Sequence, residues 1–227
     1  DVEWSEVDAI AVTDGPGLVG ALLVGAMAAR GLSVATGRPL LGVHHLEGHL
    51  CSALIGRGDL ELGPHLCLLV SGGHTEIVEV AGLGRYRLVG STRDDAVGEA
   101  FDKVAKMMGL GYPGGPVVDR LAREGNPEAI AFPRAMLDQD NFDFSFAGLK
   151  TAVSVHLQKH GQPQSRQALA DICASFEAAV ADVLVRKLLR ARAHTDARAL
   201  HVVGGAAANT ALRSALVAIL ALAPAAT

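Results

Sequence analysis

The sequence has 227 residues, half of them hydrophobic, which is enough to bury the core of one large domain or of two lobes. Its net charge of −4 argues against a protein that binds nucleic acid by itself through one basic face, although 20 lysines and arginines could form a local patch. No apolar run approaches the ~18 uncharged residues that span a bilayer. Three scattered cysteines and no secretory signal favour a reducing, cytoplasmic compartment.

Short β-type runs alternate with longer helical runs in the first part of the chain, which is typical of α/β proteins. In chain order the pattern predicts a strand at 9–12, a helix at 18–35, a strand at 40–43, a helix at 44–55 and a glycine-containing connection at 56–64. We place a boundary between two lobes in that connection, so that the lobes comprise residues 1–64 and 65–227.

In the second lobe, two apolar strands at 66–70 and 75–80 enclose Ser71-Gly72-Gly73-His74 and predict a β-hairpin. A third strand at 86–89 follows, and then an amphipathic helix at 95–108 that ends at a glycine-proline loop, 111–116. The remaining pattern predicts a helix at 166–193, a strand at 199–203 and a last helix that Asn209 opens. The most apolar stretch, 215–226, is expected to be a core helix or a cut end.

The segment 45–49, H-L-E-G-H, places the imidazoles of His45 and His49 one helical turn apart, where they can chelate a transition metal. Glu47 lies off the shared face, so this is not the H-E-x-x-H metallopeptidase motif. For an isolated histidine pair, ordinary surface or core histidines are the more common interpretation by roughly two to one. A metal site also needs at least a third ligand.

Three further segments carry a functional and a structural interpretation. The glycines of the 71–75 turn could cradle a phosphate or form an ordinary hairpin turn. Asp95, Glu99 and Asp102 fall on one helical stripe, which favours a solvated face by about three to one over a ribose-binding carboxylate. The 199–209 segment ends a strand in two glycines and a helix start, which is either a nucleotide site or a plain turn. The aromatic run 142–146 is expected to pack in the core.

Six segments together closely resemble one family in order and spacing: V-x-H-H-L-E-G-H-L, V-S-G-G-H-T-E, D-D-A-V-G-E-A-F-D-K-V-A-K, G-Y-P-G-G-P, F-S-F-A-G-L-K-T-A-V and V-V-G-G-A-A-A-N. This is the tRNA N(6)-adenosine threonylcarbamoyltransferase family, formerly called O-sialoglycoprotein endopeptidase or glycoprotease. The resemblance runs from about Val7 to Arg213. It implies an α/β, actin-like ATPase fold of two lobes, related to Hsp70 and sugar kinases, with a nucleotide cleft between the lobes.

The resemblance also implies the reaction and its site. The threonylcarbamoyl group passes from threonylcarbamoyl-AMP to the N(6) amine of the adenosine that follows the anticodon in ANN-decoding tRNAs. One iron or zinc ion per subunit would be held by His45 and His49, and no general base emerges from the residues. The residues that would hold the adenylate substrate are Leu69, Val70, Ser71, Gly72, Gly73, Asp102, Gly115, Asp119 and Asn209.

The sequence departs from the family at both ends. The family's opening strand of the type G-I-E-T-S-C-D-E-T has no match, and neither has its later D-N-G-A-M-I segment, whose aspartate is the third metal ligand. We therefore expect a fragment that lacks both family termini, with an open sheet edge and no activity by itself.

The resemblance implies partners beyond tRNA and threonylcarbamoyl-AMP. These are the synthase that makes the adenylate, an inactive paralogue and a P-loop ATPase, and no membrane. Three alternatives remain open: a metal-dependent glycoprotein endopeptidase, a relative of sugar or acetate kinases, and a non-catalytic scaffold paralogue of the same complex. The histidine pair speaks against a kinase, because kinases place phosphates and magnesium with carboxylates.

Overall fold

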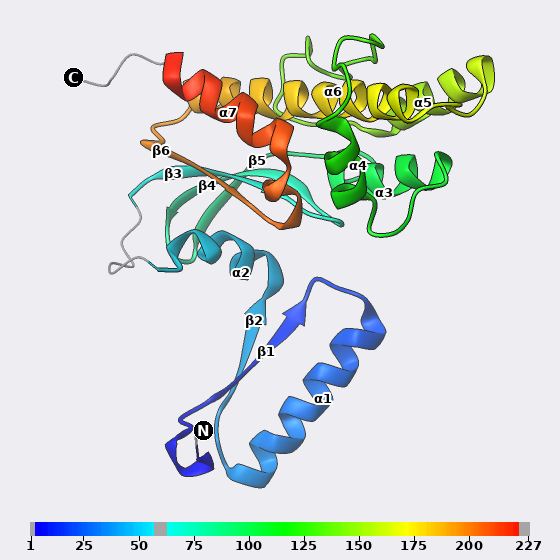
Figure 1. Cartoon of the computed structure of the whole chain (residues 1–227). Helices are drawn as coiled ribbons and strands as arrows, with labels where there is room; N and C mark the ends of the chain where they lie inside the picture. The colour runs from blue at the N-terminus through cyan, green and yellow to red at the C-terminus, as the bar shows by residue number, and fades with distance from the viewer. Residues whose placement is uncertain (1–2, 57–62, 223–227) are drawn as a thin grey trace. The chain divides into compact units, whose positions relative to one another are not determined.

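A computed structural model describes residues 3–56 and 63–222. The chain divides into two compact units, Asp1–Gly58 and Asp59–Thr227, and the division falls inside the glycine-containing connection at 56–64. The colour ramp of Figure 1 runs through the first unit in blue and through the second from cyan to red. Each unit is described separately below.

The first unit is a small α/β assembly. After the 3₁₀ turn η1 (Trp4–Glu6), strand β1 (Ile10–Gly15) pairs in parallel with β2 (Leu40–His44), and α1 (Val19–Thr36) connects them. Gly37, in the left-handed conformation, ends α1, as is common for glycine at that position. Helix α2 (His45–Cys51) and the 3₁₀ turn η2 (Ser52–Leu54) follow β2 directly. The expected strands and helices of this region are confirmed to within a few residues.

Helix α1 is strongly apolar. By length and composition alone it could cross a membrane, with a mean hydropathy of 1.5 over Val19–Thr36. Arg30 interrupts the run of uncharged residues but leaves the average high. The apolar stretch expected at 215–226 is helical as far as Leu222, in α7, and its remaining residues lie outside the described part of the chain. Val19 and Val34 are both 81% exposed, and every residue of β2 is exposed.

The second unit is built on a mixed four-stranded sheet in the order β5-β4-β3-β6. The strands are β3 (His65–Val70), β4 (Thr75–Gly82), β5 (Arg85–Ser91) and β6 (Ala199–Val203). Strand β3 is antiparallel to β4 and parallel to β6, with Leu69 opposite Val203 at the end where both strands finish. The predicted hairpin, third strand and late strand are confirmed, and so is the α/β class.

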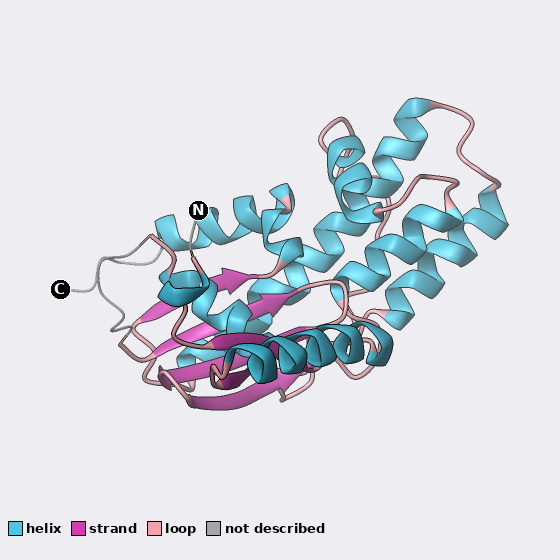
Figure 2. Ribbon diagram, turned by 90° about the horizontal axis from the view of Figure 1, so that it is seen from below, coloured by secondary structure: helices cyan, strands magenta, loops and turns pink. Residues whose placement is uncertain are grey.

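Helices pack against this sheet, as Figures 1 and 2 show. They are α3 (Val97–Met107), α4 (Gly114–Ala122), α5 (Ala147–His160), α6 (Arg166–Ala193), the 3₁₀ turn η3 (Gly205–Ala208) and α7 (Thr210–Leu222). Alternate residues of β3, Leu66 and Leu68, are fully buried and join a core with residues of α3 to α6. Phe101 and Phe176 meet edge to face in that core, with ring centroids 5.0 Å apart.

The predicted loop 111–116 is wrong in its second half. Gly114, Gly115 and Pro116 form the first turn of α4, a helix that the pattern did not predict. Proline is tolerated in a first turn, because its missing N–H would have no helical partner there. Glycine and proline therefore open a helix here instead of prolonging a loop.

Both buried thiols of the second unit are chemically shielded. Cys67 in β3 and Cys173 in α6 are each 0% exposed. Burial raises the pKa of the Cys67 thiol to about 12. Burial, followed by the nearby Glu177 charge, raises the pKa of the Cys173 thiol to about 12 as well. Neither thiol is therefore ionised near neutral pH.

The three acidic residues of the expected stripe, Asp95, Glu99 and Asp102, have different partners in the structure. Asp95 precedes α3 and forms ion pairs with Lys103 at 2.6 Å and with Lys150 of α5 at 2.8 Å. These ion pairs hold the pKa of Asp95 below its usual value, although burial alone would raise it. Lys103 also pairs with Glu99 at 2.7 Å. The stripe is therefore partly a structural link between α3 and α5.

Asp94 caps the start of α5. Its carboxylate accepts hydrogen bonds from the Ser145 hydroxyl at 2.5 Å and from the backbone amides of Phe146 and Ala147 at 2.8 and 3.1 Å. The side chains of Phe144 and Phe146 are buried, so the expected core packing of this aromatic run is confirmed. The cap fixes where that run ends and the helix begins.

We predict that Asp94→Ala lowers the free energy of unfolding by about 1–2 kcal/mol, because two backbone amides at the start of α5 lose their acceptor. Asp94→Asn keeps an oxygen that can accept these bonds and should lose less than half as much. Urea denaturation followed by circular dichroism measures both. Equal losses in the two variants would contradict a capping role.

Candidate functional site

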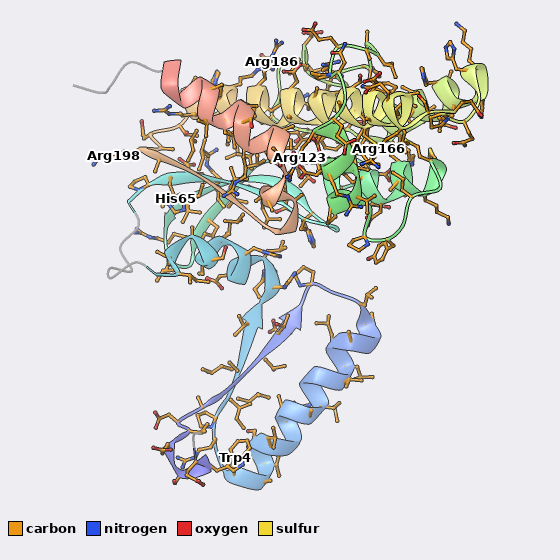
Figure 3. The ribbon with its side chains drawn as sticks, viewed as in Figure 1. Trp4, His65, Arg123, Arg166, Arg186 and Arg198 are labelled. Carbon is orange, nitrogen blue, oxygen red and sulfur yellow. The ribbon has the colours of Figure 1, made fainter. Side chains whose placement is uncertain are left out.

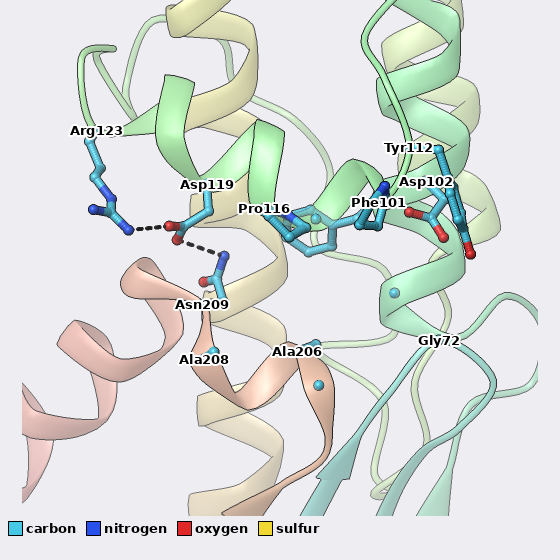
Figure 4. Close-up of a pocket in the computed structure, with 14 residues that line it drawn as sticks. Gly72, Phe101, Asp102, Tyr112, Pro116, Asp119, Arg123, Ala206, Ala208 and Asn209 are labelled. Carbon is cyan, nitrogen blue, oxygen red and sulfur yellow. Dashed lines mark hydrogen bonds and ion pairs between the residues drawn. The ribbon is translucent and has the colours of Figure 1, made fainter.

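A cavity of about 560 Å³ lies within the second unit (Figure 4). It is formed by the turn after β3, the first half of α3, the loop and helix of α4, and the segment from η3 to the start of α7. Its volume suits a nucleotide-sized ligand. The residues that line it are Gly72, Gly98, Phe101, Asp102, Tyr112, Pro113, Gly115, Pro116, Asp119, Arg123, Gly205, Ala206, Ala208 and Asn209.

Backbone without side chains forms much of the cavity wall. A Cβ atom at Gly98 would lie 2.8 Å from the Gly72 Cα and from the Ser71 carbonyl oxygen, so only glycine lets α3 start against this turn. The Gly98 amide donates to the Ser71 carbonyl at 3.1 Å. Gly72, Gly115 and Gly205, in contrast, have nothing within 4 Å of the position that a Cβ would take. Their backbone faces open space, as in sites that approach a phosphate closely.

Asp102 and Tyr112 mark one side of the cavity, and Figure 4 shows them close together. Asp102 uses one carboxylate oxygen to accept the Gly114 amide at 2.7 Å, which joins α3 to the start of α4. Tyr112 is 86% exposed. The second oxygen of Asp102 and the ring of Tyr112 therefore offer an acceptor and an aromatic surface to a ligand in the cavity.

Asp119 anchors the opposite side. It accepts the Thr210 amide at 2.6 Å, the Thr210 hydroxyl at 3.1 Å and an Arg123 guanidinium N–H at 2.5 Å. The Asn209 amide nitrogen donates to it at 3.3 Å, as Figure 4 shows. Burial alone would raise the pKa of Asp119, but these hydrogen bonds and the Arg123 charge lower it. Asp119 is therefore ionised and ties α4 to the start of α7.

Every polar atom of the Asn209 side chain is engaged within the protein. Its oxygen accepts the Leu212 amide at 2.9 Å and caps α7. Its amide nitrogen donates to Asp119 and also to Glu177, a buried residue of α6 that is 3% exposed. Asn209 thus holds three helices together beside the cavity.

Glu177 is a carboxyl group in an apolar setting. Burial raises its pKa to about 7; the Asn209 hydrogen bond acts in the opposite direction, and the charge of Asp119 raises it further. Near neutral pH a large fraction of Glu177 is therefore protonated, whereas Asp119 is ionised. Two carboxyl groups that share one amide thus differ in charge.

The structure brings together part of the set of residues expected to hold an adenylate. Five of them line the cavity: Gly72, Asp102, Gly115, Asp119 and Asn209. The other four, Leu69, Val70, Ser71 and Gly73, belong to the end of β3 and its turn and are not among the lining residues. Leu69 and Val70 are fully buried, so neither is exposed to a ligand in the cavity.

Three residues of the site were not found from the sequence. Arg123 follows Asp119 by one helical turn, and the i,i+4 pairing of opposite charges is a signal that could have found it. Glu177 stands inside the apolar run A-S-F-E-A-A-V, and this pattern could have identified it, because a charge on a buried helix face needs a partner. Tyr112 lay within the recognised G-Y-P-G-G-P segment but was not singled out.

The expected metal ligands lie in the first unit. His45 and His49 are on α2 with ring centroids 4.7 Å apart, so the predicted helical spacing is confirmed. Among residues 3–56 and 63–222 no group of three or more His, Cys, Asp and Glu side chains is placed to hold an ion. The described residues thus offer two imidazole ligands at this position.

Comparison with known proteins gives consistent results. The family model for tRNA N6-adenosine threonylcarbamoyltransferase matches residues 1–225. Curated relatives with that name from Anaeromyxobacter dehalogenans and Moorella thermoacetica are both 54% identical, over 93% and 94% of this chain and 63% and 62% of their own length. One from Syntrophotalea carbinolica is 52% identical over 93% of this chain and 61% of its own length. The chain thus spans a little over three fifths of these relatives.

Two solved structures share the fold at low sequence identity. Component A of the (R)-2-hydroxyglutaryl-CoA dehydratase of Acidaminococcus fermentans has a TM-score of 0.52 at 15% identity, over 92% of this chain and 78% of that one. HypF of T. kodakarensis has a TM-score of 0.68 at 12% identity, over 95% of this chain and 37% of that one. At such identities the similarity concerns the fold alone.

The pKa of Glu177 predicts how stability changes with pH. Because its folded-state value of about 7 exceeds the ordinary 4.5, the folded protein keeps a proton that the unfolded chain releases between these values. The free energy of unfolding should therefore fall as the pH rises from about 4.5 to 7, by at most roughly 3 kcal/mol. Glu177→Gln should remove this slope in urea denaturation series, and an unchanged slope would show that another group causes it.

Proposed function

The chain belongs to the tRNA N6-adenosine threonylcarbamoyltransferase family, and on that premise we propose that the protein transfers a threonylcarbamoyl group to tRNA. The donor is threonylcarbamoyl-AMP, and the acceptor is the N(6) amine of the adenosine after the anticodon in ANN-decoding tRNAs. The cavity in the second unit is the adenylate site. The observation that carries this assignment is the bare glycine wall at Gly72, Gly115 and Gly205 in a cavity that Asp102 also lines.

The geometry of the cavity supports an adenylate in three ways. The first turns of α3 and α4 lie at its wall, through Gly98 and Gly115, and helix N-termini favour a phosphate. The second oxygen of Asp102 can accept a ribose hydroxyl. Arg123 is a cation beside the cavity that Asp119 holds in place. Asp119 and Asn209 are bonded to each other and to the protein, so they support the site more than they bind the ligand directly.

In the transfer step AMP is the leaving group, and the glycine wall and the two helix N-termini hold its phosphate as negative charge develops. The adenosine amine is a weak nucleophile, so its placement against the carbamoyl carbon supplies much of the rate. Tyr112, exposed at the edge of the cavity, is placed to contact a ligand or a nucleic-acid base.

The wider assignment also follows from the family. We propose that the two units belong to the two lobes of an actin-like ATPase fold, and that the protein works in the cytoplasm. Its partners are tRNA, the synthase that makes the adenylate, an inactive paralogue and a P-loop ATPase. The resemblance to the family and the fold similarity to the two solved structures support this assignment.

We further propose that His45 and His49 contribute to a site for one iron or zinc ion. Imidazole pairs at i and i+4 suit either metal, so the residues fit as part of a ligand set that further ligands must complete. A metal ion bound there would supply Lewis-acid chemistry toward a carbonyl oxygen.

The transfer reaction is tested in a chimera, because the chain matches only part of its relatives. Residues 1–225 replace the matching segment of the Moorella thermoacetica protein, which supplies the flanking segments. The chimera is incubated with threonylcarbamoyl-AMP and unmodified tRNA, and the digested nucleosides are analysed by mass spectrometry. Threonylcarbamoyladenosine should form on tRNA with adenosine after the anticodon and not on the same tRNA with guanosine there. No product on either tRNA, under conditions in which the unaltered Moorella thermoacetica protein forms it, would reject the transferase assignment.

Gly115→Ala in this chimera should reduce product formation at least tenfold, because the new methyl group enters the space that the adenylate takes. Gly148→Ala is a matched control. Both glycines are the second residue of a helix, α4 or α5, and both have nothing within 4 Å of the Cβ position, but only Gly115 lines the cavity. Full activity in both variants would place the adenylate elsewhere.

His45→Ala together with His49→Ala should remove most of the iron or zinc that elemental analysis finds bound to the purified protein. The control changes His156 and His160 to alanine, a second pair at i and i+4 on α5 with ring centroids 4.6 Å apart. This control separates a specific site from general chelation by paired histidines. Metal content that is unchanged in the first variant, or lost equally in both, would overturn the assignment.

A further inference from the structure

Two carboxyl groups from different helices converge on one side-chain amide at the cavity. The Asn209 amide nitrogen lies 3.3 Å from an oxygen of Asp119 in α4 and donates also to Glu177 in α6. The Asn209 oxygen is occupied by the Leu212 amide at 2.9 Å, so turning the amide over would lose the cap of α7. The orientation of Asn209 therefore depends on both carboxyl groups remaining in place.

The charged and titratable groups around Glu177 are few. Asp119 and Arg123 face it from α4, and Cys173 lies one turn earlier on α6 itself. Among the residues that the structure describes, Arg123 is the cation near Glu177, and it bonds to Asp119, the other carboxylate, at 2.5 Å. Two ionised carboxylates on a single donor would repel each other at a site where Glu177 is only 3% exposed. The arrangement favours one proton on the pair.

We propose that Glu177 is a positioning residue of the cavity, and that an adenylate with a phosphate group binds there together with uptake of one proton from solvent by Glu177. The inference rests on the proposed function of the cavity as an adenylate site. In the neutral state Glu177 accepts from Asn209 through its carbonyl oxygen, and Asn209 in turn fixes Asp119 and the start of α7.

The direction of this coupling follows from charge. A phosphate in the cavity adds negative charge next to Asp119 and Asn209, which line it, and Asn209 is bonded to the buried Glu177. The added charge makes the neutral form of Glu177 more favourable. A ligand that binds the protonated protein better must raise the proton affinity of the site in return, because linkage is reciprocal. Adenylate affinity should therefore fall as the pH rises through the range in which free Glu177 loses its proton.

The experiment uses the methyl ester of AMP, whose single phosphate charge does not change between pH 5 and 9. Isothermal titration calorimetry at pH 7 in two buffers of different ionisation enthalpy gives the number of protons taken up per ligand bound. Because about half of free Glu177 already carries its proton at pH 7, binding to the wild-type chain should add at most about half a proton on average. The affinity of the wild-type chain should fall several-fold between pH 6 and 8. Glu177→Gln should show neither effect. Glu128→Gln, which removes an exposed carboxyl group away from the cavity, should behave as wild type.

The outcomes separate the two proposals. If wild-type protein does not bind the ester, the adenylate site itself is rejected, and the role of Glu177 with it. If the ester binds without proton uptake, or Glu177→Gln takes up as many protons as wild type, only the role of Glu177 is overturned. A purely structural role would change the melting temperature of the variant without removing the buffer dependence. If Glu177→Gln does not fold, the titration of the wild-type protein in two buffers still tests the proposal, because the absence of proton uptake on binding would overturn it.

Discussion

The cavity depends on how closely backbone segments approach one another at the end of β3. Gly204, with φ of 96°, sits where a Cβ atom would collide with the Val70 carbonyl. A Cβ atom at Gly98 would likewise lie only 2.8 Å from the Ser71 carbonyl oxygen and from the Gly72 Cα. Because no side chain separates these segments, the turn after β3, the start of α3 and the end of β6 meet at one place. The remaining walls, from α4 and α7, are arranged around that junction.

The polar contacts beside the junction form one connected network. Arg123, Asp119, Asn209, Thr210 and Glu177 link α4, α6 and α7, and they leave the glycine backbone free to meet a ligand. In a buried network each bond also holds its neighbours in place, so the loss of one partner leaves the others with unsatisfied groups. The protein therefore separates the residues that shape the cavity from those whose backbone faces it.

The sequence predicted the strands and most helices because their apolar periodicity is strong and local. Helix 166–193 and strand 199–203 were predicted with the bounds that the structure has. Helix α4 was missed because its first turn is made of two glycines and a proline, residues that locally favour a loop. Such a local preference is outweighed by the Asp102 carboxylate, which accepts the Gly114 amide from the opposite side of the loop.

The site itself was only partly predictable. Motif order identified five of the residues that line the cavity, together with four that do not, because the lining depends on hydrogen bonds between segments far apart in the chain. Asp119 and Asn209 are 90 positions apart and bonded to each other. Glu177 belongs to no motif, and its role appears only when three helices are packed together.

The two buried cysteines of the second unit allow its local opening to be measured chemically. Cys67 lies in the central strand and Cys173 in the longest helix, and both thiols are shielded while that unit stays folded. Alkylating reagents attack only the exposed, ionised thiol. Modification of these two cysteines therefore requires the sheet or α6 to open, so the alkylation rate at each one measures how often its part of the unit opens, without any attached dye or introduced residue.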